Sequence, residues 1–196
     1  MSTATRSATT LRLFVAASVP SGFAASIEAA IDPWKAAVPG ARWTPAERLH
    51  LTLRFLGSTD PGRVPWIEDR LAEAAARCRP FEVDVRGLGA FPSPRRARVL
   101  WVGLDDAEGR LADLAGAVQE AIAAEYPPDR RSFGPHVTVA RCDPPAALPM
   151  REVAANLEIG SLAVGEMSLV RSHLGASPRY ETLATFALGG GHATRG

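Results

Sequence analysis

The chain has few of the features that mark disulfide-rich proteins or proteins drawn to polyanions by their overall charge. Its 196 residues include only two cysteines, Cys78 and Cys142, which form neither a disulfide framework nor a C-x-x-C metal-binding spacing. Twenty-two basic residues against twenty-one acidic ones give a net charge of +1. No global field therefore attracts the chain to nucleic acid or to an anionic membrane. We expect a protein of the reducing cytoplasm, in which any site for a polyanion is local.

Long apolar runs are also missing. The first residues resemble a signal peptide superficially, but the apolar run over residues 13–19 is short and contains Ser18. Pro20 then begins a helical pattern, so we interpret this segment as part of the folded domain. No stretch approaches the roughly twenty apolar residues that cross a bilayer. We therefore expect no membrane association.

The length suits one domain. Residues 1–9 are rich in Ser, Thr and Ala, and residues 189–196 are rich in Gly, and neither stretch has apolar periodicity. We predict that both are disordered tails. The folded unit is then a single domain over residues 10–188, which we expect to be a monomer.

Strand-like and helix-like segments alternate between the tails. Period-two alternation predicts strands, and apolar residues at helical spacing predict helices. The predicted strands cover residues 11–17, 49–57, 81–91, 98–104, 136–141, 162–170 and 180–188. The predicted helices cover residues 21–38, 64–78, 107–124 and 151–157. A hairpin through "PSPRR" (92–96) and the polar alternation favour an α+β fold with antiparallel sheets.

Two of the four histidines occupy the same frame. The segment "RLHLTLRFLG" holds His50 and Thr52, and "FGPHVTVAR" holds His136 and Thr138. A single H-x-T is a weak motif, but its duplication on two predicted strands is not.

Side chains on a strand alternate between two faces. Residues 50, 52 and 54 should therefore share one face, and the apolar residues 51, 53 and 55 should fill the other. In the second segment Val137 and Val139 should pack inward. Two such strands side by side would bring two imidazoles and two threonine hydroxyls to one site.

This set of groups suits in-line displacement at phosphorus. One imidazole takes a proton from the attacking water or hydroxyl, and the other gives a proton to the departing alkoxide. An unperturbed imidazole changes its protonation state near neutral pH, which suits both roles. Threonine hydroxyls stabilise the charge that develops on the non-bridging oxygens. A zinc site that uses both histidines with Cys142 or Asp143 is the alternative, but H-x-T lacks the usual ligand spacing.

The chain resembles the 2H phosphoesterase superfamily, specifically its RNA 2′,3′-cyclic phosphodiesterase or 2′-5′ RNA ligase-like branch. The likeness extends beyond the two H-x-T segments to "LRLFVAASVP", "LGAFPSPRRARVLWVGL" and "MSLVRSHLGASPRYETLATFAL", in the same order. It implies a bilobal fold with helices outside, in which two antiparallel sheets, related by a pseudo-twofold axis, face each other across a central cleft.

The resemblance also implies hydrolysis of RNA or nucleoside 2′,3′-cyclic phosphate ends to 2′-phosphates, without a metal or another cofactor. It assigns catalysis to His50 and His136 and substrate binding to Thr52 and Thr138. Our working hypothesis makes His50 the general acid and His136 the general base, although the sequence leaves the order open.

Arg141, five residues after His136, matches an arginine of the family that would clamp the phosphate. Simple alternation places Arg141 on the valine face, so we expect the strand to bulge or end just before it. Phe14 and Phe133 are candidates for stacking on the terminal base. As core aromatics, both would have a purely structural role.

Three alternative functions remain open. The first is a related phosphodiesterase that acts on another nucleotide, and the second is ligation through a 2′-5′ bond by the reverse reaction. The third is a module that binds RNA ends without turnover, although such a module would not need a pair of proton-transfer groups.

Overall fold

The structure is a computed structural model that describes residues 10–129, 132–148, 157–175, 179–189 and 194–195. The strands are β1 (Leu11–Ser18), β2 (Ala41–Trp43), β3 (His50–Thr59), β4 (Phe81–Phe91), β5 (Ala97–Asp105), β6 (His136–Ala146), β7 (Glu158–Val164), β8 (Glu166–His173), β9 (Arg179–Ala187) and β10 (Thr194–Arg195). The helices are α1 (Ser21–Ala37), α2 (Val64–Arg77) and α3 (Arg110–Ala121), with short 3-10 turns η1 (Ala46–Arg48), η2 (Pro61–Arg63) and η3 (Pro94–Arg96).

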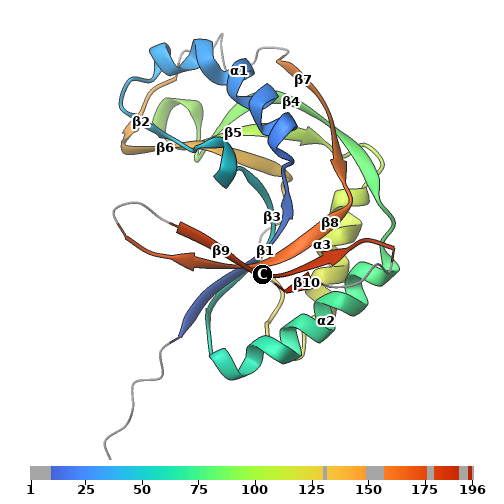
Figure 1. Ribbon diagram of the computed structural model, residues 1–196. Coiled ribbons are helices and arrows are strands. Elements are labelled where there is room, and N and C mark those ends of the chain that lie inside the picture. Colours follow the sequence, from blue (N-terminus) through green and yellow to red (C-terminus); the bar gives the residue numbers. More distant parts are fainter. Residues whose placement is uncertain (1–9, 130–131, 149–156, 176–178, 190–193, 196) are drawn as a thin grey trace, which may run out of the picture.

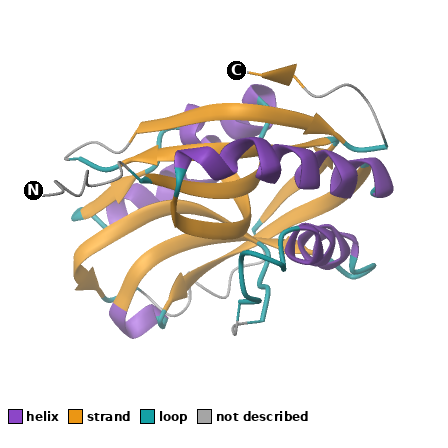
Figure 2. Ribbon diagram, turned by 90° about the horizontal axis from the view of Figure 1, so that it is seen from below, coloured by secondary structure: helices purple, strands orange, loops and turns teal. Residues whose placement is uncertain are grey.

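The strands form an antiparallel sheet in the order β10-β9-β8-β1-β3-β6-β5-β4-β7, and β2 is added beside β6. The sheet curls strongly (Figures 1 and 2), so its two halves face each other. The strands that carry the two H-x-T segments, β3 and β6, are neighbours at the centre of this order. The prediction of an α+β fold with two facing antiparallel halves is confirmed, and the halves are continuous through the β3–β6 pair.

Helices cover the outer surface of each half. Figure 1 shows α1 over the half that contains β4 to β7, and α2 with α3 under the half that contains β1, β3 and β8. Each helix buries apolar residues that recur three or four positions apart, which is the spacing of one helix face. These buried residues are Ile27 and Ile31 of α1, Ile67 and Leu71 of α2, and Leu111, Leu114 and Val118 of α3.

The packing leaves one large core and one small apolar cluster. The large core is a continuous set of buried residues between the helices and the outer face of the sheet. The small cluster lies on the inner face and consists of Phe14, Ala16 and Val170, with Tyr180 against it. The inner face of the sheet is therefore partly apolar, in a region where the sequence places its histidines.

Two features of the chain path differ from the sequence prediction. The strand predicted over residues 162–170 is wrong, because β7 and β8 are separate strands that pair with β4 and β1 in opposite halves. Gly165 alone separates the end of β7 from the start of β8. Within the tail predicted from residue 189, residues 194–195 pair with β9 as β10. An edge strand such as β9 offers free backbone groups for this pairing.

Strand β2 was not predicted, since three residues are too few for a periodic pattern. The predicted helix over residues 151–157 and the predicted tail over residues 1–9 fall almost entirely outside the described residues. No helix in the described part of the chain is long and apolar enough to cross a membrane.

Candidate active site

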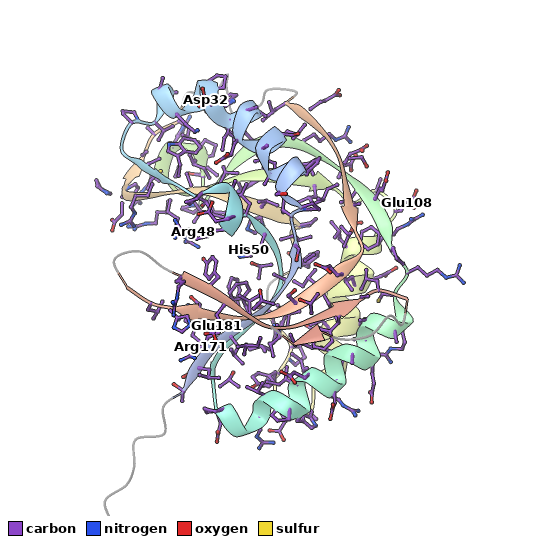
Figure 3. All side chains as sticks on the ribbon, in the orientation of Figure 1. Asp32, Arg48, His50, Glu108, Arg171 and Glu181 are labelled. Carbon is purple, nitrogen blue, oxygen red and sulfur yellow. The ribbon has the colours of Figure 1, made fainter. Side chains whose placement is uncertain are left out.

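The two H-x-T segments lie side by side at the junction of the two halves. Leu51 of β3 pairs with Val137 of β6, and this is the backbone pair that joins these strands. Both residues are buried in the core. Because neighbouring residues on a strand point to opposite faces, His50 and His136 project from the inner face on either side of this pair. Figure 3 shows His50 between the two halves, near Arg48.

Each histidine ring is held by a main-chain carbonyl two residues earlier. His50 Nδ1 lies 2.8 Å from the carbonyl oxygen of Arg48, and His136 Nδ1 lies 2.7 Å from that of Gly134. A carbonyl only accepts hydrogen bonds, so Nδ1 carries the proton in both rings. The Nε2 atom of each ring is therefore the atom that can gain or lose a proton during a reaction.

Aromatic rings pack against both imidazoles. The centre of the His50 ring lies 5.0 Å from that of Phe14 and 5.2 Å from that of Tyr180, which it meets edge-on. The His136 ring lies 5.2 Å edge-on from Phe91 and 6.2 Å from Trp101. The surroundings of the two histidines are thus similar in kind, as the duplicated sequence frame predicts.

Burial lowers the pKa of His50 below 6.5, the value of an unperturbed imidazole. The positive charges of Arg141 and His136 lower this pKa further, whereas the hydrogen bond to the Arg48 carbonyl raises it. These effects show that Arg141 and His136 lie within electrostatic reach of His50. The structure therefore brings Arg141 and the two histidines near one another.

A bulge in β6 brings Arg141 to this site. Trp101 of β5 pairs with Thr138, but the next pair is Leu100 with Ala140, so Val139 has no partner of its own on β5. The extra residue reverses the alternation that follows it. Ala140 is therefore buried and Arg141 is exposed on the inner face. The prediction of a bulge before Arg141 is confirmed.

Strand β3 bulges at the matching position, which corrects the predicted faces. Ala16 of β1 pairs with Thr52, and the next pair is Val15 with Arg54, so Leu53 is the extra residue. Arg54 consequently points away from the histidines and forms an ion pair of 3.5 Å with Asp129.

Phe55, predicted to lie in the core, is 56% exposed, and its ring is 6.0 Å from Phe14. Strict alternation from His50 fails here because a bulge shifts the phase by one residue. Phe55 stands five residues after His50, as Arg141 stands five residues after His136. The two H-x-T strands therefore present different side chains at equivalent positions.

A pocket of about 160 Å³ lies beside His50 on the side of β1, β8 and β9. Phe14, Tyr180, Ser168 and Thr182 are among the residues that line it. Its size and its mixed apolar and hydroxyl lining suit part of a nucleoside.

A comparison with protein-family models matches residues 23–176 of the chain to the 2′-5′ RNA ligase superfamily. The chain belongs to this superfamily. The match includes both H-x-T segments and Arg141. It confirms the family assignment that the sequence motifs predicted.

Curated relatives of this 2′-5′ RNA ligase superfamily member cover most of its length. A protein of Methanothermobacter thermautotrophicus is 33% identical over 184 residues, which are 91% of this chain and 99% of the relative. A protein of Aeropyrum pernix is 36% identical over 143 residues, which are 70% of this chain and 80% of the relative. Both relatives carry the name RNA 2′,3′-cyclic phosphodiesterase.

Solved structures show the same fold. A crystal structure of a Thermus thermophilus protein has a TM-score of 0.75 and 31% identity, and the match covers 93% of this chain and all of that one. The crystal structure of E. coli LigT complexed with 3′-AMP has a TM-score of 0.72 and 27% identity. That match covers 91% of this chain and 98% of LigT.

The structure places the two predicted stacking residues differently. Phe14 lines the pocket beside His50 but is only 3% exposed, so its ring offers little surface to a ligand. Phe133 is partly buried against the large core and is not among the residues that line the pocket.

Sequence reasoning missed the aromatic rings around the histidines, namely Tyr180, Phe91 and Trp101. Each lies on a strand distant in sequence from the histidine it contacts. The only signal in the described part of the chain was the presence of aromatic residues on predicted strands, which is also typical of core residues.

The described residues contain no group of three or more His, Cys, Asp or Glu side chains arranged to hold a metal ion. The zinc alternative placed Cys142 beside the histidines. Cys142 is 4% exposed and belongs to the large core on the other face of β6, away from the imidazoles.

Proposed function

We propose that this superfamily member hydrolyses RNA or nucleoside 2′,3′-cyclic phosphate ends to 2′-phosphates, without a metal ion. The observation that carries the proposal is the matched pair of imidazoles, each held through Nδ1 by a main-chain carbonyl with Nε2 left for proton transfer. The names of the relatives and the 3′-AMP bound to E. coli LigT support a nucleotide substrate.

In the proposed reaction His136 takes a proton from water through Nε2, and the water oxygen attacks phosphorus. The bond from phosphorus to the 3′ oxygen breaks, and His50 protonates that oxygen, which leaves a 3′-hydroxyl and a 2′-phosphate. The lowered pKa of His50 makes its imidazolium a stronger acid. The negative charge of a bound phosphate favours that imidazolium, so substrate binding prepares the acid.

Thr52 and Thr138 follow the two histidines by two residues on the same faces of their strands, and both are partly exposed. We assign their hydroxyls to the non-bridging phosphate oxygens, where charge develops in the transition state. Arg141 would bind the same oxygens with its planar guanidinium. Phe14 forms a wall of the pocket beside His50 that receives the nucleoside, and Phe133 stays a prediction as a stacking residue.

The test is incubation with a short RNA that ends in a 2′,3′-cyclic phosphate, in the presence of EDTA, with separation of the 2′- and 3′-phosphate products. We expect the 2′-phosphate at an undiminished rate. Loss of activity with EDTA contradicts the metal-free reaction, and a 3′-phosphate contradicts the assigned leaving group. Binding of a cyclic-phosphate dinucleotide without turnover identifies a binding module instead.

The roles of the histidines are tested by substitution. His50→Ala and His136→Ala should each lower kcat by roughly a hundredfold or more, because each removes one proton transfer. Each variant should also lose a different limb of the pH-rate profile. His173→Ala is the matched control, because His173 lies on the β8–β9 hairpin and contacts Glu181. Full activity in either of the first two variants contradicts the mechanism.

We further propose that the protein acts as a monomer in the cytoplasm. Light scattering at micromolar concentration measures the oligomeric state directly. A dimer at that concentration would contradict the monomeric state. Cell fractionation tests the cytoplasmic location, and recovery of the protein in another fraction would contradict it.

A further inference from the structure

Two arginines lie directly opposite each other on the neighbouring strands β2 and β6. Arg42 of β2 pairs with Arg141 of β6, and Figure 1 shows β2 alongside β6. Cross-strand partners project from the same face of a sheet. The residues on either side of Arg141, Ala140 and Cys142, are buried in the core, so both guanidiniums point to the inner, solvent-exposed face.

This arrangement is unfavourable for the protein alone. Like charges directly opposite each other on paired strands are destabilising. Neither Arg42 nor Arg141 has a carboxylate partner among the residues that the structure describes, whereas Arg54 and Arg63 are paired with Asp129 and Glu125. Two exposed guanidiniums side by side, without a counter-charge, are the arrangement that binds phosphate groups.

The position of the pair relative to the histidines assigns a phosphate to each arginine. The bulge at Val139 turns Arg141 to the face of β6 that carries His136, and its charge acts on His50, so we assign it to the reacting cyclic phosphate. Arg42 lies one strand farther from β5, on the edge of β6 that continues beyond the Leu51–Val137 pair. A phosphate at Arg42 is therefore a second phosphate of the same substrate, held next to the reacting one.

We propose that Arg42 binds the phosphodiester one nucleotide before the cyclic phosphate, so that the protein prefers oligonucleotides to cyclic mononucleotides. This inference rests on the proposed function, because it assumes that the cyclic phosphate lies between the histidines. The charge of the internucleotide linkage is the feature that Arg42 recognises. Base identity contributes nothing at this contact.

The experiment compares kcat/KM for three substrates. The first is uridine 2′,3′-cyclic phosphate, and the second is a dinucleotide with the same cyclic end and a 2′-deoxy first sugar, which prevents cleavage of the linkage. The third is that dinucleotide with an uncharged methylphosphonate linkage. Arg42→Gln removes the charge and keeps most of the side-chain length. Arg77→Gln is the control, because it removes an exposed charge from the C-terminal end of α2.

We expect the wild-type protein to favour the charged dinucleotide over the mononucleotide by about tenfold, the size of one exposed charge-assisted contact. The methylphosphonate should lose most of this advantage. Arg42→Gln should lower the ratio of kcat/KM for the charged over the uncharged dinucleotide to near one. It should also reduce the slope of log(kcat/KM) against log[salt] by about 0.7, the value for one single-strand phosphate contact. Arg77→Gln should keep the wild-type ratio and slope.

Three outcomes overturn the inference. Equal kcat/KM values of the wild-type protein for the charged and uncharged dinucleotides show that the protein does not recognise the negative charge of the linkage. An equal loss in Arg42→Gln for all three substrates shows a structural role of Arg42. An unchanged ratio in Arg42→Gln shows that another group reads the charge. Failure of the wild-type protein to hydrolyse any of the substrates instead overturns the proposed function, and this inference with it.

Discussion

Gly89 on β4 is required by the tryptophan beside His136. Gly89 pairs directly with Trp101 of β5, and the indole ring lies over the glycine. A Cβ added at Gly89 would fall inside the van der Waals envelope of three carbon atoms of that ring. The substitution Gly89→Ala therefore forces the Trp101 ring to move.

The cost of that movement follows from the contacts of the ring. Placing an extra carbon in a packed site typically costs about 1–3 kcal/mol. Trp101 also packs 5.3 Å from Phe91, and an aromatic pair contributes about 0.5–1.5 kcal/mol. We expect Gly89→Ala to lower the free energy of unfolding by about 2 kcal/mol, or the Tm by roughly 4–8 °C. Because Phe91 and Trp101 both contact His136, kcat should also fall by about ten- to a hundredfold.

The assay is urea unfolding together with kcat on a cyclic-phosphate substrate. Gly116→Ala is the matched control, because a Cβ at Gly116 in α3 meets nothing within 4 Å and should stabilise the protein by about 0.5–1 kcal/mol. In the double variant with Trp101→Leu, the shorter side chain leaves room for the methyl group. Its loss of stability should be smaller than the sum of the two single losses. Wild-type stability and kcat in Gly89→Ala would refute this reasoning.

Three further predictions concern charged groups. The NMR titration midpoint of His50 should lie below 6.5, and Arg141→Gln should raise it, because a nearby positive charge is removed; an unchanged midpoint would contradict their proximity. Arg54→Met should lower the free energy of unfolding in urea by about 1 kcal/mol yet leave kcat within about twofold, since Arg54 pairs with Asp129 away from the histidines. The hydrogen bond with His173 lowers the pKa of Glu181 in the folded protein below 4.5, its ordinary value. This carboxylate therefore stabilises the fold above pH 4.5, and the stabilisation is lost as the pH falls through the lowered pKa of the folded state. Glu181→Gln should therefore show a smaller fall in Tm below pH 4.5 than the wild type, and identical curves would refute the contribution.

The sequence predicted the reactive side chains of the site better than the residues that surround them. Period-two alternation places His50 with Thr52, and His136 with Thr138, on one face because each pair precedes any irregularity in its strand. The family resemblance then supplied Arg141, and its conflict with alternation predicted the bulge. The physical rule and the resemblance together were more informative than either alone.

The rest depended on pairing between distant segments. The bulge at Leu53 is set by how β3 meets β1, so alternation alone placed Phe55 in the core and Arg54 with the histidines. Similarly, β7 and β8 read as one apolar stretch around Gly165, although they pair with different strands. Bulges and strand boundaries of this kind depend on which strands pair in the folded protein. The residues next to each position in the sequence do not reveal that pairing.

The carbonyls that orient the two imidazoles belong to the backbones of Arg48 and Gly134. A side-chain carboxylate in that role is lost by a single mutation, whereas a carbonyl is present whatever side chain the residue bears. A substitution at position 48 or 134 thus keeps the carbonyl that sets the tautomer. Variants selected for new substrates can change either side chain and keep both proton-transfer atoms in place, provided that the chain path before each strand is kept.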